Sequence, residues 1–201
     1  MTKISAASAI TSLADTDELG IASGGASKKI SGSLLRRSVG RRDALAAADL
    51  GIIAEPYPLD LGSFASPGSG VLTGCPIYLY KGEVVTGVKV AANSTGSAVT
   101  LAKGALFSVD GATQYGVSAS MHASLTTGLF AFPFTAAYTV LVSGVYIASV
   151  LYVGATAPSL VRGQVNVSNN ASRGKSQSGR TDVPAAATWT SNANNFWVPA
   201  Y

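Results

Sequence analysis

The sequence predicts a mainly β protein, with an antiparallel β-sandwich preceded by a small module made of a β-hairpin and a helix. Hydrophobic residues make up 47% of the 201 residues but charged residues only 12%, roughly half of the about 25% usual for a soluble domain. Valine, tyrosine, serine and threonine are abundant, and these residues favour extended chain. Turn signals recur at the roughly 8–12-residue interval expected of a sandwich or barrel.

Residues 1–55 are predicted to form the hairpin and helix. Leu19 and Ile21 alternate with small residues over 18–23, and the glycine pair at 24–25 permits the tight turn to a second strand over 27–31. Apolar residues spaced by three and four predict a helix over 34–50. One hairpin and one thin helical stripe cannot enclose a core. The module is therefore expected to dock on its own copies, on the next domain or on another protein, and self-association is the simplest of these. The candidate attachment and oligomerisation residues are Leu19, Ile21, Ile30, Leu35 and Val39.

Residues 56–69 are predicted to be a linker, because Pro56 and Pro58 stiffen the chain and stop a helix. The sandwich is expected over 70–201. Its predicted strands are 70–80, 84–92, 98–109, 114–121, 129–134, 138–142 and 145–153. The polar stretch 166–182 is predicted to be an exposed loop, and 185–190 and 195–201 are predicted to return as closing strands.

The distribution of charge excludes two classes of partner. The net charge of +4 is divided between two distant segments, and no Asp, Glu, Lys or Arg occurs from 111 to 161. This spread argues against a nucleic-acid-binding stripe. Residues 128–154 are long and apolar enough to cross a bilayer as a helix, but Pro133 and Gly144 interrupt them and β-branched and aromatic residues dominate. Membrane insertion is therefore not expected, and the N-terminus lacks the apolar core of a signal peptide.

No motif predicts a catalytic, cofactor or metal site. Arg173 to Ser176 matches the end of a phosphate-binding loop, but Asn169 stands where the motif needs its first glycine. His122 has no carboxylate or nucleophile motif near it in sequence. Cys75 lies inside an apolar strand and is expected to be a buried, inert thiol. A carbohydrate-active enzyme remains the alternative from another class. It would need two of Asp60, Glu83, Asp110 and Asp182 at roughly 5–9.5 Å.

Two parts of the chain resemble proteins of tailed bacteriophages. Residues 4–5 and 10–39 resemble the N-terminal module of phage fibre and appendage proteins, and residues 70–201 resemble the jelly-roll domains that end small tail or head fibres. In the first part the matching residues are Asp17, Leu19, Ile21, Gly24, Gly25, Lys28, Lys29 and Ile30. In the second part they are Gly70-Val71-Leu72, Asp110-Gly111, Gly144-Val145-Tyr146 and Asn195-Phe196-Trp197.

The resemblance implies a non-enzymatic virion protein that forms a homotrimer and carries a C-terminal jelly-roll-like sandwich. It would be a short tail fibre or host-contacting appendage, or alternatively a capsid (head) fibre or decoration protein. It would be made in the host cytoplasm without a signal peptide, bind other tail or capsid proteins through its N-terminal module, and lie on the particle surface. A host cell-surface glycan is the expected ligand of the sandwich tip. The candidate receptor-contact residues are Tyr115, Trp189, Arg173 and Arg180.

Overall fold

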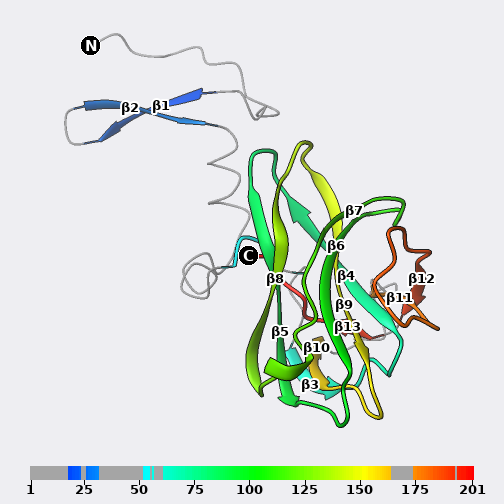
Figure 1. Ribbon diagram of the computed structural model, residues 1–201. Helices are drawn as coiled ribbons and strands as arrows, with labels where there is room; N and C mark the ends of the chain where they lie inside the picture. Colours follow the sequence, from blue (N-terminus) through cyan, green and yellow to red (C-terminus); the bar gives the residue numbers. More distant parts are fainter. Residues whose placement is uncertain are drawn as a thin grey trace, which may run out of the picture. The chain divides into compact units, whose positions relative to one another are not determined.

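The computed structural model describes residues 18–23, 26–31, 52–54, 56, 61–163, 174–192 and 194–201. The chain divides into two compact units, Met1–Asp49 and Leu50–Tyr201. In the first unit, β1 (Glu18–Ser23) and β2 (Ala26–Ser31) form an antiparallel ribbon (Figure 1), which confirms the predicted hairpin. Leu19 pairs with Ile30 and Ile21 with Lys28. Leu19, Ile21 and Ile30 therefore occupy one face of the ribbon, because directly opposite residues share a face and successive residues alternate. The predicted helix, with Leu35 and Val39, lies outside the described residues.

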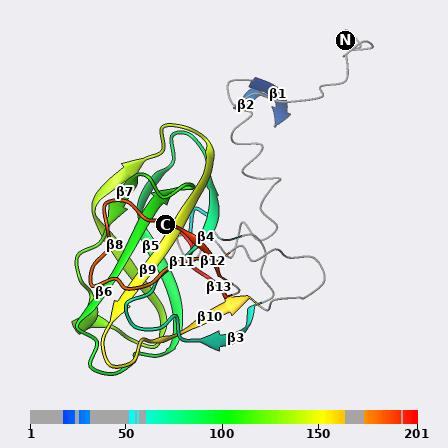
Figure 2. The ribbon, with the colours of Figure 1, turned by 90° about the vertical axis from the view of Figure 1, so that its right-hand side faces the viewer.

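The second unit contains two antiparallel sheets, as the sequence predicts for a sandwich (Figure 2). In the five-stranded sheet, β5 pairs with β8 and β10, and β10 also pairs with β3 and β13. The six-stranded sheet has the order β12-β11-β4-β9-β6-β7. The strands of the first sheet are β3 (Leu61–Ala65), β5 (Val84–Ser94), β8 (Gly128–Thr139), β10 (Ser159–Gly163) and β13 (Asn195–Phe196). Those of the second are β4 (Leu72–Leu79), β6 (Leu101–Ser108), β7 (Gln114–Val117), β9 (Gly144–Val153), β11 (Gly174–Gln177) and β12 (Thr190–Asn192).

The pairings of β3 to β10 are nested. β6 pairs with β7, β5 with β8, β4 with β9 and β3 with β10, all antiparallel. The eight strands thus pair as one long hairpin whose tip is the β6–β7 turn. Two further pairings, β6 with β9 and β5 with β10, roll this hairpin into the two sheets. The chain reverses at every turn, so each sheet is antiparallel throughout.

The main core lies between the two sheets. Phe130, Phe132 and Phe134 of β8 are buried while the residues between them are more exposed, the alternation typical of a sheet with one face on the core. On β9, by contrast, every residue from Tyr146 to Tyr152 is buried. Continuous burial means that this strand is covered on both faces.

Residues 178–189, which we call the strap, cover the outer face of the six-stranded sheet. A second hydrophobic cluster forms there, distinct from the main core, and the strap contributes Ala187, Val183 and Trp189 to it. Phe107, Ile147 and the other sheet residues of this cluster are the outward-facing members of β4, β6, β7 and β9. In Figures 1 and 2 the strap is the orange-to-red trace next to β11 and β12.

The C-terminal residues complete the five-stranded sheet. Ala200 forms bridges with both Val88 of β5 and Ala54. The carbonyl of Tyr201 accepts hydrogen bonds from the backbone N–H groups of Thr86 and Gly87 at 2.7 and 3.2 Å. The tail therefore lies along β5 and joins it to the segment that leads into the sandwich.

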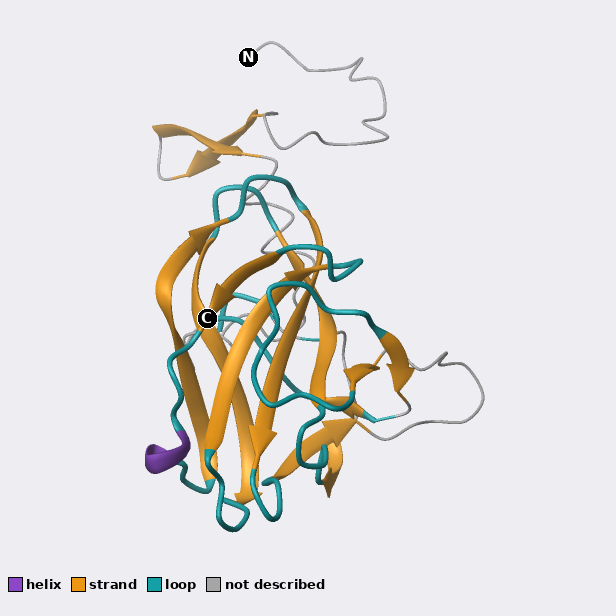
Figure 3. Cartoon of the chain, turned by 45° about the vertical axis from the view of Figure 1, so that its right-hand side comes forward, coloured by secondary structure: helices purple, strands orange, loops and turns teal. Residues whose placement is uncertain are grey.

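Helix is scarce in the described residues. The 3₁₀ turn η1 (His122–Ser124), purple in Figure 3, is the one helical element among them. No helix in this part of the chain is long and apolar enough to span a membrane. Residues 128–154, which we considered as a membrane helix, form β8, the turn after it and β9.

Several sequence predictions need correction. Segments 129–134 and 138–142 are not two strands; β8 runs from Gly128 to Thr139, with an irregular register opposite Val85 and Gly87. The predicted linker 56–69 contains β3, which pairs with β10, so the second unit begins before residue 70.

The stretch 166–182 is not one exposed loop where it is described. Residues 174–177 form β11, which pairs with β4 and β12, and residues 178–182 begin the strap. Of the predicted closing strand 185–190, only Thr190 lies in a strand; the preceding residues belong to the strap. The apolar residues of the strap pack on the outer face of the six-stranded sheet instead of pairing with a neighbouring strand.

Candidate functional surfaces

Tyr115, a predicted receptor-contact residue, is packed within the sandwich and is not an exposed aromatic. Its ring stacks on Tyr138 with the centroids 4.6 Å apart and meets the edge of Tyr146 at 5.4 Å. Burial raises the pKa of the Tyr115 hydroxyl, with a further contribution from Tyr138. Tyr115 is therefore half-buried, with one ring face stacked on Tyr138, and not the exposed aromatic that the sequence suggested; its role in receptor contact stays a prediction.

Trp189 lies on the other side of the same sheet. Its ring meets Phe107 at right angles with the centroids 5.4 Å apart, as part of the cluster under the strap. The indole N–H is buried and has no hydrogen-bond partner among the described residues. Trp189 is therefore half-buried and packs in the cluster under the strap. The structure does not bring it together with Tyr115. Arg180 lies in the strap, where its backbone N–H donates to Gly70, and Arg173 lies outside the described residues.

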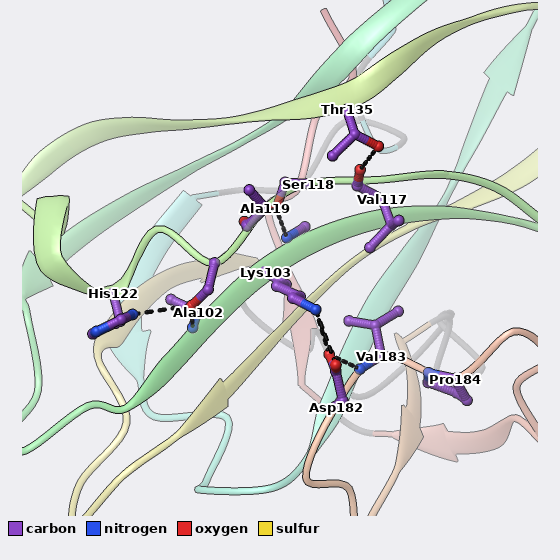
Figure 4. A network of polar contacts seen from close by, with 12 residues as sticks. Ala102, Lys103, Val117, Ser118, Ala119, His122, Thr135, Asp182, Val183 and Pro184 are labelled. Carbon is purple, nitrogen blue, oxygen red and sulfur yellow. Dashed lines mark hydrogen bonds and ion pairs between the residues drawn. The ribbon is translucent and has the colours of Figure 1, made fainter.

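A set of polar contacts holds the strap on the sheet (Figure 4). The Lys103 ammonium on β6 donates to both carboxylate oxygens of Asp182 at 2.8 and 2.9 Å. The backbone N–H of Val183 donates to the same carboxylate at 2.7 Å. Burial acts to raise the pKa of Asp182, but the hydrogen bonds from Lys103 and Val183 and the charge of Lys103 outweigh it and lower the pKa.

Two more contacts fix the later part of the strap. Gln114 Nε2 donates to the carbonyl of Pro184 at 2.9 Å, and the backbone N–H of Ala187 donates to the carbonyl of Gly111 at 2.8 Å. Gly111 has a φ of +82°, and a Cβ there would lie 2.1 Å from the carbonyl oxygen of Ala187. Glycine is therefore required at 111 both by the turn and by the close approach of the strap.

The described carboxylates of the enzyme alternative each stabilise local structure. Glu83 accepts a hydrogen bond from the backbone N–H of Tyr80 at 2.8 Å and closes the β4–β5 turn. Asp110 accepts from the Ser108 hydroxyl and the Ala112 N–H in the β6–β7 turn, and these hydrogen bonds lower its pKa. Asp182 binds Lys103, and Asp60 lies outside the described residues. These carboxylates come from two separate turns and the strap.

Cys75 is buried, as the sequence predicts. Its thiol donates to the carbonyl of Val198 at 3.6 Å, and burial raises its pKa to about 12, so the reactive thiolate is scarce at neutral pH. His122 is exposed on η1, where Nδ1 lies 3.0 Å from the Ser120 hydroxyl. Among the described residues, no group of three or more His, Cys, Asp or Glu side chains could hold a metal ion.

The most distinctive surface of the sandwich is an apolar cap at one end. Of the eight large hydrophobic residues that are exposed in the described part of the chain, six lie there. Leu141 and Val142 are 68% and 69% exposed, and the other four are 43–54% exposed. The cap consists of Tyr78, Val84, Val109, Leu141, Val142 and Val145.

Strand register places the six residues at one end of the sandwich, with Val84 on the five-stranded sheet and Tyr78 and Val145 on the six-stranded sheet. Tyr78 on β4 pairs with Val145 on β9. Ser108, which precedes Val109, pairs with Tyr146, which follows Val145. At the same end, Val84 pairs with Thr139, two residues before Leu141. The cap was missed from the sequence because its members come from four separate segments, and nothing in a linear pattern shows that these segments end at the same place.

Comparison with known proteins gives no match: no protein-family model, no curated protein and no solved structure is significantly similar to the chain.

Proposed function

We propose that this chain is a non-enzymatic structural protein of a tailed bacteriophage, a short homotrimeric tail fibre or host-contacting appendage whose sandwich is a jelly roll. The observation that carries the proposal is the nested pairing of β3 with β10, β4 with β9, β5 with β8 and β6 with β7. A jelly roll is an eight-stranded double sheet of this antiparallel kind, and viral capsid and lectin domains use it. The fold alone serves both tail and head fibres, so attachment to a capsid is the alternative.

The hairpin supports an attachment role for the first unit. β1 and β2 pair with each other, and the ribbon places Leu19, Ile21 and Ile30 on one face. A two-stranded ribbon alone is at best marginally stable in water. Three copies that share these faces would bury them and so provide the missing core. In the predicted helix over 34–50, Leu35 and Val39 would extend the same interface.

The use of the carboxylates supports a non-enzymatic role. A glycosidase needs one carboxyl group to hold a proton and another to attack or activate water. The carboxylates of Asp110 and Asp182 have lowered pKa values, the opposite of what a general acid requires. Glu83 closes a turn. The described carboxylates therefore do not favour cleavage of a glycan.

The mass of the native assembly tests the proposal. The full chain should run as a trimer, three times 20.3 kDa or about 61 kDa, in native mass spectrometry and analytical ultracentrifugation. Replacing Leu19, Ile21 and Ile30 together with Ser should release monomers, while the far-ultraviolet circular dichroism of the sandwich persists.

Ala22→Ser with Lys29→Gln, on the opposite face of the ribbon, is the matched control and should leave the trimer intact. A wild-type chain that stays monomeric at micromolar concentrations would count against the proposal.

A further inference from the structure

We propose that the apolar cap is a second interface between copies of this chain, in which Lys81 of one copy lies against Asp110 of the next. The inference rests on the proposed homo-oligomeric function and extends it, because it places a contact in the sandwich in addition to the hairpin. The partner is a second copy of the same chain.

The first support is the concentration of apolar surface. Isolated exposed hydrophobic residues are common on proteins, but contiguous apolar patches mark interaction sites. Six of the eight exposed large hydrophobic residues of the described chain lie at this one end of the sandwich. The remaining two, Phe64 and Leu129, lie on the five-stranded sheet nearer the opposite end of the sandwich from the cap.

The second support is the rigidity of the turns that present these side chains. Lys81 N–H donates to the Ser143 hydroxyl at 2.9 Å and Gly82 N–H to the Val140 carbonyl at 2.8 Å. The Tyr146 hydroxyl donates to the Val142 carbonyl at 2.7 Å. The first two bonds join the turn after β4 to the turn after β8, and the third joins the turn after β8 to β9. Leu141 and Val142 are thus held outward in a fixed backbone and lose little conformational freedom when they bind.

The third support is charge complementarity, which selects a second copy as the occupant. Lys81 is exposed in the β4–β5 turn and Asp110 is exposed in the β6–β7 turn, with β9 between β4 and β6. The cap therefore has one positive side and one negative side. A head-to-tail contact repeated around a rotation axis would bring each Lys81 to the Asp110 of the neighbouring copy, and such contacts close into rings.

The small size of the cap predicts that it binds only weakly by itself. Six side chains are fewer than the roughly 20–30 residues a side of a standard interface. The cap would therefore act together with the hairpin, since linking two weak contacts in one chain raises the overall affinity. We expect substitutions in the cap to weaken the assembly and not to unfold the chain.

Leu141→Lys in the full chain is the direct test, with Leu129→Lys as the matched control at an exposed leucine outside the cap. Sedimentation velocity over a range of concentrations should show that Leu141→Lys raises the dissociation constant by about tenfold or more, whereas Leu129→Lys leaves it unchanged. Both variants should keep the wild-type thermal midpoint, because both side chains are exposed.

A charge cycle then tests the pairing. Lys81→Glu should weaken association by about tenfold in the wild-type chain but by about threefold or less in the Asp110→Asn background. Asp110→Asn is chosen because the amide oxygen can still accept the hydrogen bonds of the turn. Equal effects of Lys81→Glu in the two backgrounds would disprove the Lys81–Asp110 contact.

The outcomes separate this inference from the proposed function. If Leu141→Lys leaves the assembly unchanged while the hairpin substitutions dissociate it, the cap interface is wrong and the trimeric proposal stands. If Leu141→Lys dissociates the assembly and the hairpin substitutions do not, the cap interface stands and the attachment role of the hairpin falls. Loss of binding to another virion or host component, with unchanged self-association, would identify a different occupant and overturn the inference.

Discussion

Two tyrosines of β9 show how the surroundings of a single hydroxyl set its contribution to stability. Tyr146 and Tyr152 both face the main core, and burial raises the pKa of each. The Tyr146 hydroxyl donates to the carbonyl of Val142. The Tyr152 hydroxyl is buried without a hydrogen-bond partner among the described residues. A buried polar group without a partner loses its hydration and gains nothing in exchange.

Tyr152→Phe is therefore expected to raise the free energy of unfolding by about 1 kcal/mol, whereas Tyr146→Phe should lower it by a similar amount. Both substitutions delete one oxygen from the same strand and keep the ring, so each serves as the control for the other. Equilibrium unfolding in urea measures the difference. A clear loss of stability in Tyr152→Phe would show that this hydroxyl is satisfied.

At the scale of elements, the strap decides which faces of the six-stranded sheet reach solvent. It packs on Phe107 and Ile147, whereas Tyr78 and Val145 of the same sheet stay exposed. Its hold on the sheet combines packing of Ala187 and Trp189 with the Lys103–Asp182 ion pair. The ion pair is partly exposed, so solvent screens it and its contribution is small.

Asp182→Asn should lower the free energy of unfolding by at most about 1 kcal/mol at neutral pH. The pKa of Asp182 is lowered in the folded state, so the stabilisation is present above the ordinary carboxyl pKa of about 3.9 and disappears as the pH falls through the lowered value. The gap between wild type and variant should therefore close in acid, as measured by urea unfolding at several pH values.

Lys103→Met supplies the control for this prediction. In that background the carboxylate has lost its cation, so Asp182→Asn should have almost no effect at neutral pH. An effect that persists without Lys103, or that grows in acid, would contradict the assigned role of the pair.

At the scale of the whole second unit, the C-terminal tail closes the five-stranded sheet. Residues 199–201 accept hydrogen bonds from the backbone of Thr86, Gly87 and Lys89 on one side and from Ile53 and Ala54 on the other. The Lys89 ammonium lies 4.6 Å from the centre of the Tyr201 ring. The tail thus connects residues 53–54, which precede the sandwich strands, to β5 through backbone hydrogen bonds.

Deleting residues 199–201 should lower the thermal midpoint by ten degrees or more, because several backbone groups of β5 lose partners at about 1–3 kcal/mol each. Hydrogen exchange followed by mass spectrometry should show faster exchange over 52–54 and 86–89. Lys89→Met, which removes the ammonium from the Tyr201 ring and keeps the backbone hydrogen bonds of the tail, is the mild control. Unchanged exchange in the deletion variant would contradict the closing role of the tail.

The sequence by itself determined the fold class, the hairpin and most strand positions of this protein, because alternation and turn residues are local signals. Cys75 could be placed in the core for the same reason, since its whole strand is apolar. Only the tertiary structure decided that 178–189 is a strap, that 199–201 closes a sheet, and that six scattered apolar residues meet in one cap. That Tyr115 and Trp189 are half-buried could not be foreseen, because an aromatic ring in a polar stretch has no local mark of burial. These features depend on contacts between residues far apart in the sequence, such as Ala54 and Ala200, which a linear pattern does not encode.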